Sequence, residues 1–279
     1  MPSARAYAAS AGAVACGALL AGCDAIVGFG DLPPSAAPPL AEACFAGGLR
    51  PVEPKTELVL RVPFTENGGV AVSGPLEVKA CEVFDPTCES PLSFGVTDAA
   101  GVAELIVPAA PPAGEFLGFL RVDRPGYFRG STFFRPPPRV DATLPAAIAV
   151  TDQVVTLLTM VLGIDRATLD ERAHLAVLPV TCGRQPVAGI EPVLPPELDL
   201  TDSSTVTLVR NAGNLLPGQN VTAADGIVVF ANLRLPEGQD SWPITLSLID
   251  QATRAEFVPP QLVPLRRGEV TTLVVAPEP

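Results

Sequence analysis

The sequence predicts a mainly β chain with two β-sandwich regions joined by a short helical connector. Its 32 prolines and 24 glycines require frequent turns and would interrupt long helices. Hydrophobic residues make up 48% of the chain, which is enough to build a core. Short apolar runs separated by turn residues fill residues 57–145 and 174–279, as they do in β-sandwiches. The segment between them, 146–173, contains apolar residues at helical spacing.

The N-terminal residues carry the features of an export signal. Residues 1–22 contain one base, no acid and an apolar run that falls short of the roughly 20 residues needed to span a bilayer. This pattern predicts a secretory signal peptide over residues 1–22. The segment Leu20–Cys23 resembles the lipobox of bacterial lipoproteins. The resemblance implies cleavage after Gly22, a lipid on Cys23, and anchoring to the inner or outer membrane of a bacterial cell envelope. The alternative is an ordinary signal peptide with a chance cysteine.

Residues 23–56 are expected to form a tether between the lipid and the folded part. They are rich in proline and alanine, and residues 33–39 read PPSAAPP. Proline favours an extended backbone that rises about 3 Å per residue. The tether would therefore hold the folded part away from the membrane surface.

The cysteines predict disulfide bonds. Cys16 leaves with the signal peptide and Cys23 takes the lipid. Those that remain are Cys44, Cys81, Cys88 and Cys182. An even number in an oxidising compartment indicates two disulfides, for which three connectivities exist. The Asp-Pro turn signal between Cys81 and Cys88 favours a short closed loop, which leaves Cys44 to pair with Cys182.

Each β region is expected to contain short strands. In the first region we predict strands at 57–62, 76–80, 103–107, 116–122 and 132–135. In the second we predict strands at 174–180, 205–209, 227–230, 244–249 and 270–275. Between the regions, Asp152 is expected to cap a helix, and residues 165–172 are expected to form a second short helix.

An internal repeat links the two regions. Residues 97–102 read TDAAGV, and residues 222–227 read TAADGI. Each segment leads into an apolar strand, then a proline, a loop and another strand. The acidic residue bonds to its own backbone in such a turn, and the glycine takes a positive φ. The same order twice indicates a repeated architecture.

Residues 57–276 resemble the carboxypeptidase-regulatory-like, or transthyretin-like, modules. The resemblance rests on the turn at 97–101, the apolar strand after it, and the segment 124–127, which reads RPGY. The second region keeps the turn but lacks the Gly-Tyr pair. The resemblance implies seven-stranded, immunoglobulin- or transthyretin-like β-sandwiches. It also implies non-catalytic modules that serve structural, adhesive or carbohydrate-binding roles.

Composition and motifs argue against several functions. A net charge of −12 is unsuited to nucleic acid, whose binding requires cations that displace counterions. His174 is the only histidine, and its place between the predicted helix and strand does not suit a catalytic base. We therefore expect no catalytic residues, no cofactor and no metal site.

One stretch has the character of a ligand surface. Arginines alternate with aromatic residues over 121–139, a pattern that suits stacking on a sugar or pairing with an anionic polymer. The candidate ligand surface consists of Arg121, Arg124, Tyr127, Arg129 and Trp242. The alternative is simple strand alternation, with aromatic side chains inward and arginines outward.

The sequence thus predicts a non-catalytic lipoprotein that displays β-sandwiches for structural or protein-interaction roles. A carbohydrate-binding accessory lipoprotein with exposed aromatics is the alternative. The expected partners are the membrane, through the lipid on Cys23, and an envelope protein or polysaccharide.

Overall fold

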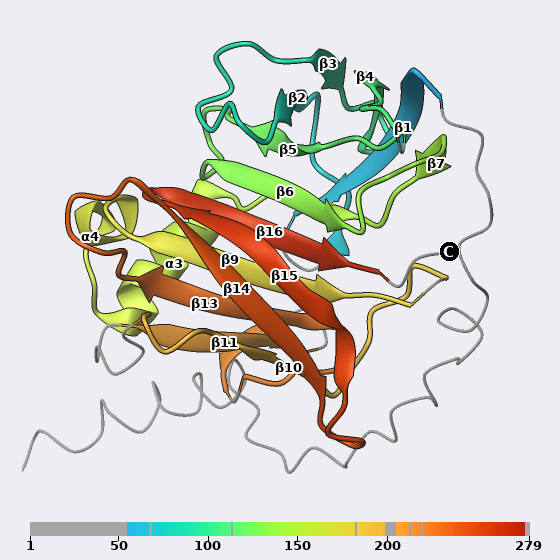
Figure 1. Cartoon of the computed structure of the whole chain (residues 1–279). Coiled ribbons are helices and arrows are strands. Elements are labelled where there is room, and N and C mark those ends of the chain that lie inside the picture. The colour runs from blue at the N-terminus through green and yellow to red at the C-terminus, as the bar shows by residue number, and fades with distance from the viewer. Residues whose placement is uncertain are drawn as a thin grey trace, which may run out of the picture. The chain divides into compact units, whose positions relative to one another are not determined.

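A computed structural model describes residues 55–66, 69–112, 114–181, 183–198, 205–211, 214–218 and 220–276. The first strands are β1 (Glu57–Thr65), β2 (Glu77–Glu82), β3 (Ser93–Val96), β4 (Val102–Pro108), β5 (Gly118–Val122), β6 (Gly130–Arg135), β7 (Ala142–Thr143) and β8 (Ala147–Ile148). The helices α3 (Asp152–Leu162) and α4 (Arg166–Asp170) follow. The later strands are β9 (Ala173–Pro179), β10 (Ile190–Val193), β11 (Val206–Asn211), β12 (Asn214–Pro217), β13 (Ile227–Leu233), β14 (Ser241–Asp250), β15 (Glu256–Arg266) and β16 (Glu269–Val275). The prediction of a mainly β chain is confirmed (Figure 1).

The two β regions repeat one pattern of strand pairing. In the first, β1 pairs antiparallel with β4 and parallel with β7, while β5 lies between β2 and β6. In the second, β9 pairs antiparallel with β13 and parallel with β16, while β14 lies between β10 and β15. Each region contributes two layers of sheet, so the predicted pair of β-sandwiches is confirmed. We call β1–β8 the first sandwich and β9–β16 the second.

The two sandwiches are joined through one sheet, which was not predicted. β16 pairs parallel with β9 on one side and with β6 on the other, and Figure 1 shows these strands side by side. The result is a nine-stranded sheet in the order β12-β11-β13-β9-β16-β6-β5-β2-β3, which we call the shared sheet. Parallel strands that are far apart in the sequence are not joined by a tight turn, so no local sequence pattern predicts that they pair.

The two faces of the shared sheet pack against different partners. Side chains alternate between the faces of a strand. Phe133 and Leu273 therefore join a core with β14 and β15, whereas Phe134 and Val274 join a core with β1 and β4. Every residue of β9 and of β16 is buried, because both faces of these strands are covered.

The helices cover the outer face of the second sandwich. Val155 of α3 and Leu169 of α4 are buried against Phe128, Ala176 and Val270. Within the residues described above, no helix is long and apolar enough to cross a membrane.

The helix ends follow common capping rules. The prediction that Asp152 caps this helix is wrong, because α3 begins at Asp152 itself and Thr151 is its N-cap, in an extended conformation. It ends at Gly163, whose φ of 65° is the left-handed conformation that glycine adopts at helix C-termini. The side chain of Asp165 caps α4 by accepting the Thr168 N–H at 2.6 Å.

The internal repeat is visible in the hydrogen bonds. Thr97 Oγ1 accepts the Leu76 N–H at 2.8 Å, and Thr222 Oγ1 accepts the Ile190 N–H at 2.9 Å. The turn glycines that follow, Gly101 and Gly226, have φ values of 77° and 67°. The two threonines therefore connect the turn at 97–101 to the start of β2, and the turn at 222–226 to the start of β10, by equivalent hydrogen bonds.

Several sequence predictions lie outside the described residues. They are the signal peptide, nearly all of the tether 23–56, the lipid site Cys23, and the pairing of Cys44 with Cys182.

Candidate functional site

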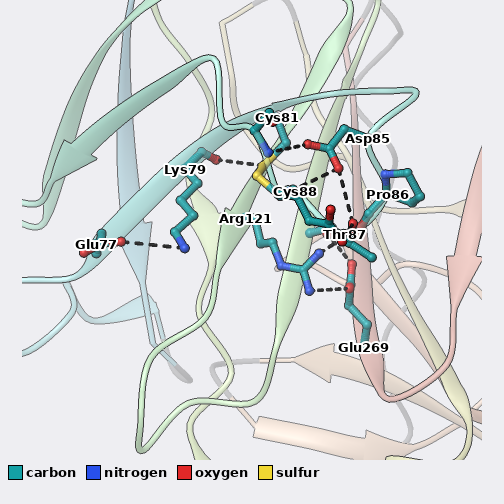
Figure 2. The surroundings of a disulfide bond; sticks show 12 residues. Glu77, Lys79, Cys81, Asp85, Pro86, Thr87, Cys88, Arg121 and Glu269 are labelled. Carbon is teal, nitrogen blue, oxygen red and sulfur yellow. Dashed lines mark hydrogen bonds and ion pairs between the residues drawn. A yellow bond between two sulfur atoms is a disulfide. The ribbon is translucent and has the colours of Figure 1, made fainter.

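The predicted disulfide between Cys81 and Cys88 is confirmed, and their Cα atoms are 5.4 Å apart. Cys81 belongs to β2, and the bond closes a loop that Asp85 organises (Figure 2). The Asp85 carboxylate accepts the N–H groups of Ser90 at 2.9 Å and Glu89 at 3.1 Å. These hydrogen bonds lower the pKa of Asp85, and the bond from Ser90 has the largest effect. They do so because they favour the charged form of the carboxyl group.

Arg121 connects this loop to the second sandwich. Its Nη1 donates to the carbonyl oxygen of Pro86 at 2.9 Å, and its Nη2 lies 3.7 Å from Glu269 Oε2 (Figure 2). The side chains of Arg121 and Glu269 are only 8% and 3% exposed. A loop of the first sandwich and a strand of the second are thus held by one guanidinium.

Two more side chains, those of Ser131 and Arg266, contact the Glu269 carboxylate. It accepts a hydrogen bond from the Ser131 hydroxyl, and Arg266 Nη1 lies 3.4 Å from its Oε1. The Arg266 guanidinium also lies 4.2 Å from the centroid of the Phe119 ring, a cation–π contact. Burial lowers the pKa of Arg266 from its ordinary value. We call Arg121, Ser131, Arg266 and Glu269 the buried ionic cluster.

A pocket of about 590 Å³ opens beside the buried ionic cluster. Its lining includes Arg121, Tyr127 and Arg129 of the candidate ligand surface. The charged residues in the lining are Arg121, Arg129, Arg166, Arg266, Arg267, Asp123, Asp170, Asp240 and Glu269. We call this hollow the arginine-lined pocket.

The arginines of this pocket are engaged by neighbouring acids. Arg129 lies 3.6 Å from Asp123. Arg166 lies 3.0 Å from Asp170, and Arg267 lies 3.1 Å from Asp240. An anionic ligand would have to compete with these carboxylates, so the geometry favours a structural role for the arginines.

The other two members of the candidate ligand surface do not line the pocket. Arg124 Nη1 donates to the carbonyl oxygen of Pro75 at 2.5 Å. Trp242 is half-buried in β14, against the core of the second sandwich. The structure therefore brings together three of the five residues, and their role in ligand binding stays a prediction.

Tyr127 is held by a carboxylate. Its hydroxyl donates to Glu66 Oε1 at 2.6 Å. Burial is the largest cause of the raised pKa of Tyr127, and this hydrogen bond is the second. The same hydrogen bond is the largest cause of the lowered pKa of Glu66. The ring is therefore positioned by the first sandwich itself.

His174 is a structural residue. Its Nε2 lies 3.0 Å from the carbonyl oxygen of Leu169, and its Nδ1 accepts the Asn232 N–H at 3.1 Å. Only the neutral ring can serve both contacts. Burial lowers the pKa of His174 to about 4.

Sequence reasoning missed three members of the buried ionic cluster: Ser131, Arg266 and Glu269. The available signal was Glu269, an acid at the start of the apolar run 270–275 and directly after Arg266, Arg267 and Gly268. An acid in an otherwise buried strand needs a partner.

No protein-family model matches the chain. No curated protein matches it.

Among solved structures, the Bacillus anthracis TIE protein is 11% identical, with a TM-score of 0.24 and coverage of 80% of this chain and 35% of that chain. The chain thus spans about a third of the length of that protein. The shaft pilin spaA from Lactobacillus rhamnosus GG is 9% identical, with a TM-score of 0.22 and coverage of 80% and 99%. A streptococcal ancillary pilin is 11% identical, with a TM-score of 0.22 and coverage of 80% and 69%. At these scores the likeness carries no argument about fold or function.

Proposed function

We propose that this chain is an exported, lipid-anchored protein of the bacterial cell envelope that displays β-sandwiches to a protein partner and is not an enzyme. The observation that carries the proposal is the disulfide between Cys81 and Cys88. Disulfides persist in compartments outside the cytoplasm, which is where the lipobox at Leu20–Cys23 would deliver the chain.

The edge of the shared sheet supports a role in protein contact. β3 is the terminal strand and pairs with β2 on one side. On this edge Phe94 is 60% exposed and Val96 is 58% exposed. An edge strand with exposed apolar side chains is a template for an added strand. We infer that an extended segment of a partner protein pairs with this edge.

Within the arginine-rich stretch 121–139 and at Trp242, the aromatic side chains give little support to carbohydrate binding. Stacking on a sugar requires an exposed ring face. Phe128, Phe133 and Phe134 are buried, and Trp242 packs against the core.

Lipid anchoring is tested by labelling producing cells with radioactive palmitate. We expect label on the wild-type chain and on a Cys16→Ala control, and none on Cys23→Ala. The Cys23→Ala protein should also move from the membrane fraction to the soluble fraction. Label that persists on Cys23→Ala would refute the lipid site.

Display through β3 is tested with a photo-cross-linking residue placed at Phe94 in living cells. We expect a discrete protein adduct at this position that disappears when Val96→Lys is added, because edge lysines oppose strand addition. The matched control is Leu262, an exposed apolar residue of β15. Equal adducts at both positions would rule out a specific role for β3.

A further inference from the structure

The loop closed by the Cys81–Cys88 disulfide (Figure 2) carries an exposed phenylalanine. Phe84 is 87% exposed, the highest value for a large hydrophobic side chain in the part of the chain that the structure describes. A phenyl ring that stays in water adds almost nothing to the burial that stabilises a fold. Folding therefore does not account for this ring, whereas aromatic side chains are frequent anchors of protein interfaces.

The loop holds the ring in a defined place. The Asp85 N–H donates to the Glu82 carbonyl oxygen at 3.0 Å, which closes a turn with Val83 and Phe84 at its centre. The Val83 N–H donates to the Leu117 carbonyl oxygen at 3.3 Å, and the disulfide joins the two ends of the loop. A side chain that is positioned before binding loses less conformational entropy when a partner covers it.

Two leucines extend the apolar surface at this end of the first sandwich. Leu117 is 45% exposed and Leu92 is 38% exposed. Because β2 pairs antiparallel with both β3 and β5, the residues after β2, before β3 and before β5 lie at one end of these strands. We call Phe84, Leu92 and Leu117 the loop-end patch. Phe94, two residues beyond Leu92, connects this patch to the exposed edge of β3.

The charges around the ring are negative. Glu82 and Glu89, which flank Phe84 in the sequence, are exposed, and residues 82–92 contain no lysine or arginine. Lys79, which precedes them, is ion-paired with Glu77. Anionic headgroups of a membrane would repel this loop, and so would the same loop on a second copy of the chain. A basic protein surface complements it.

We propose that the loop-end patch docks on a protein whose apolar pocket is rimmed by lysine or arginine. The inference rests on the display role proposed above and adds the chemistry of the partner. Phe84 fills the pocket, the two leucines pack around its mouth, and Glu82 and Glu89 meet the basic rim. A central aromatic residue with a charged surround is the usual arrangement of an interface anchor.

The first experiment places a benzoylphenylalanine photo-cross-linker at position 84 of the full chain in its native cells. The reagent inserts into C–H bonds of proteins, lipids and sugars alike, so mass spectrometry of the adduct identifies the class of occupant. We expect one protein adduct, attached at an apolar residue that has lysine or arginine beside it. The matched control is Val70, which is 67% exposed in the turn after β1 and should give no such adduct.

The second experiment measures the affinity of the purified full chain for the protein found in the adduct. Phe84→Ala should weaken binding about thirtyfold, as loss of a central interface residue does, and should leave the melting temperature unchanged. Glu82→Gln combined with Glu89→Gln should weaken binding about fivefold at low salt and reduce its dependence on salt. The matched control is Glu256→Gln, at an exposed acid that begins β15, which should change neither.

Several outcomes overturn the inference. They are a lipid or polysaccharide adduct, an adduct with a second copy of the chain, and an affinity that is unchanged by Phe84→Ala or by removal of the two acids. An adduct at position 94 with none at position 84 would refute the role of Phe84 and leave display through β3 standing. The lack of an adduct at either position would refute both.

Discussion

Glu269 shows how one charged residue is kept inside a β core. It begins the buried strand β16 and is contacted by Arg121, Ser131 and Arg266. A buried charge is tolerated when partners and hydrogen bonds replace its water. The acid therefore holds two arginines that would otherwise be buried without a counter-charge.

Removing this acid should strongly destabilise the fold. We expect Glu269→Ala to lower the free energy of unfolding by about 3–5 kcal/mol, because it leaves two buried guanidinium groups without a carboxylate. The control is Arg61→Ala, which breaks the exposed pair with Glu104 and should cost less than about 1 kcal/mol. Urea titrations of both variants measure the difference. Equal losses would show that the buried ionic cluster contributes no more than a surface pair.

His174 should make stability depend on pH. Its pKa is about 4 in the folded chain, below the ordinary value of 6.5. Between these values the unfolded chain binds a proton that the folded chain does not, so stability falls as the pH is lowered from 6.5 to 4. The total loss is roughly 3 kcal/mol. Urea titrations across this range should show a steeper loss for the wild type than for His174→Gln, and parallel curves would contradict the assignment.

At the scale of elements, the repeated turns show which features can be predicted from the local sequence. The strand over 270–275 and the turns at Gly101 and Gly226 were predicted because their signals are local. β10 was not predicted, because it is a short run interrupted by Pro192. The contacts of Glu269 with Arg121 and Ser131 were also unpredictable, since these partners lie on β5 and β6 and sequence spacing does not encode such proximity. Arg266, three residues before Glu269, was the local signal that sequence reasoning missed.

The turn at Gly226 offers a direct test. An added Cβ would lie 2.6 Å from Pro186 Cβ and 3.1 Å from Val187 N, in a backbone conformation with positive φ. We expect Gly226→Ala to lower the melting temperature more than Gly238→Ala, which shares the positive φ but has open space around the position. Both variants lose about 1 kcal/mol by placing alanine at a positive φ, so this cost cancels in the comparison. Thermal unfolding followed by circular dichroism then measures the cost of the close contact with Pro186. Equal shifts would mean that the turn relaxes.

At the scale of the whole molecule, the shared sheet should make the two sandwiches unfold together. Leu273 of β16 is fully buried and stands between Phe133 of the first sandwich and Val177 of the second. Calorimetry should show one transition whose calorimetric and van't Hoff enthalpies agree. Two separated transitions would show that the sandwiches are energetically independent.

A cavity at this seam should weaken both sandwiches. We expect Leu273→Ala to cost about 2–5 kcal/mol and to shift the single transition as a whole. Leu262→Ala, at an exposed position of β15, is the control and should change stability by less than about 0.5 kcal/mol. A shift of only part of the transition would place Leu273 in one sandwich alone.

The position of β16 in the chain also governs the order in which strand partners become available during synthesis. A polypeptide made from its N-terminus delivers β6 long before residues 269–275 emerge. Until then the outward edge of β6 lacks its partner, and the Arg121 guanidinium and the Ser131 hydroxyl lack Glu269. The nascent first sandwich is therefore exposed to mispairing until β16 arrives. A holdase that recognises bare strand edges would be most needed in this interval.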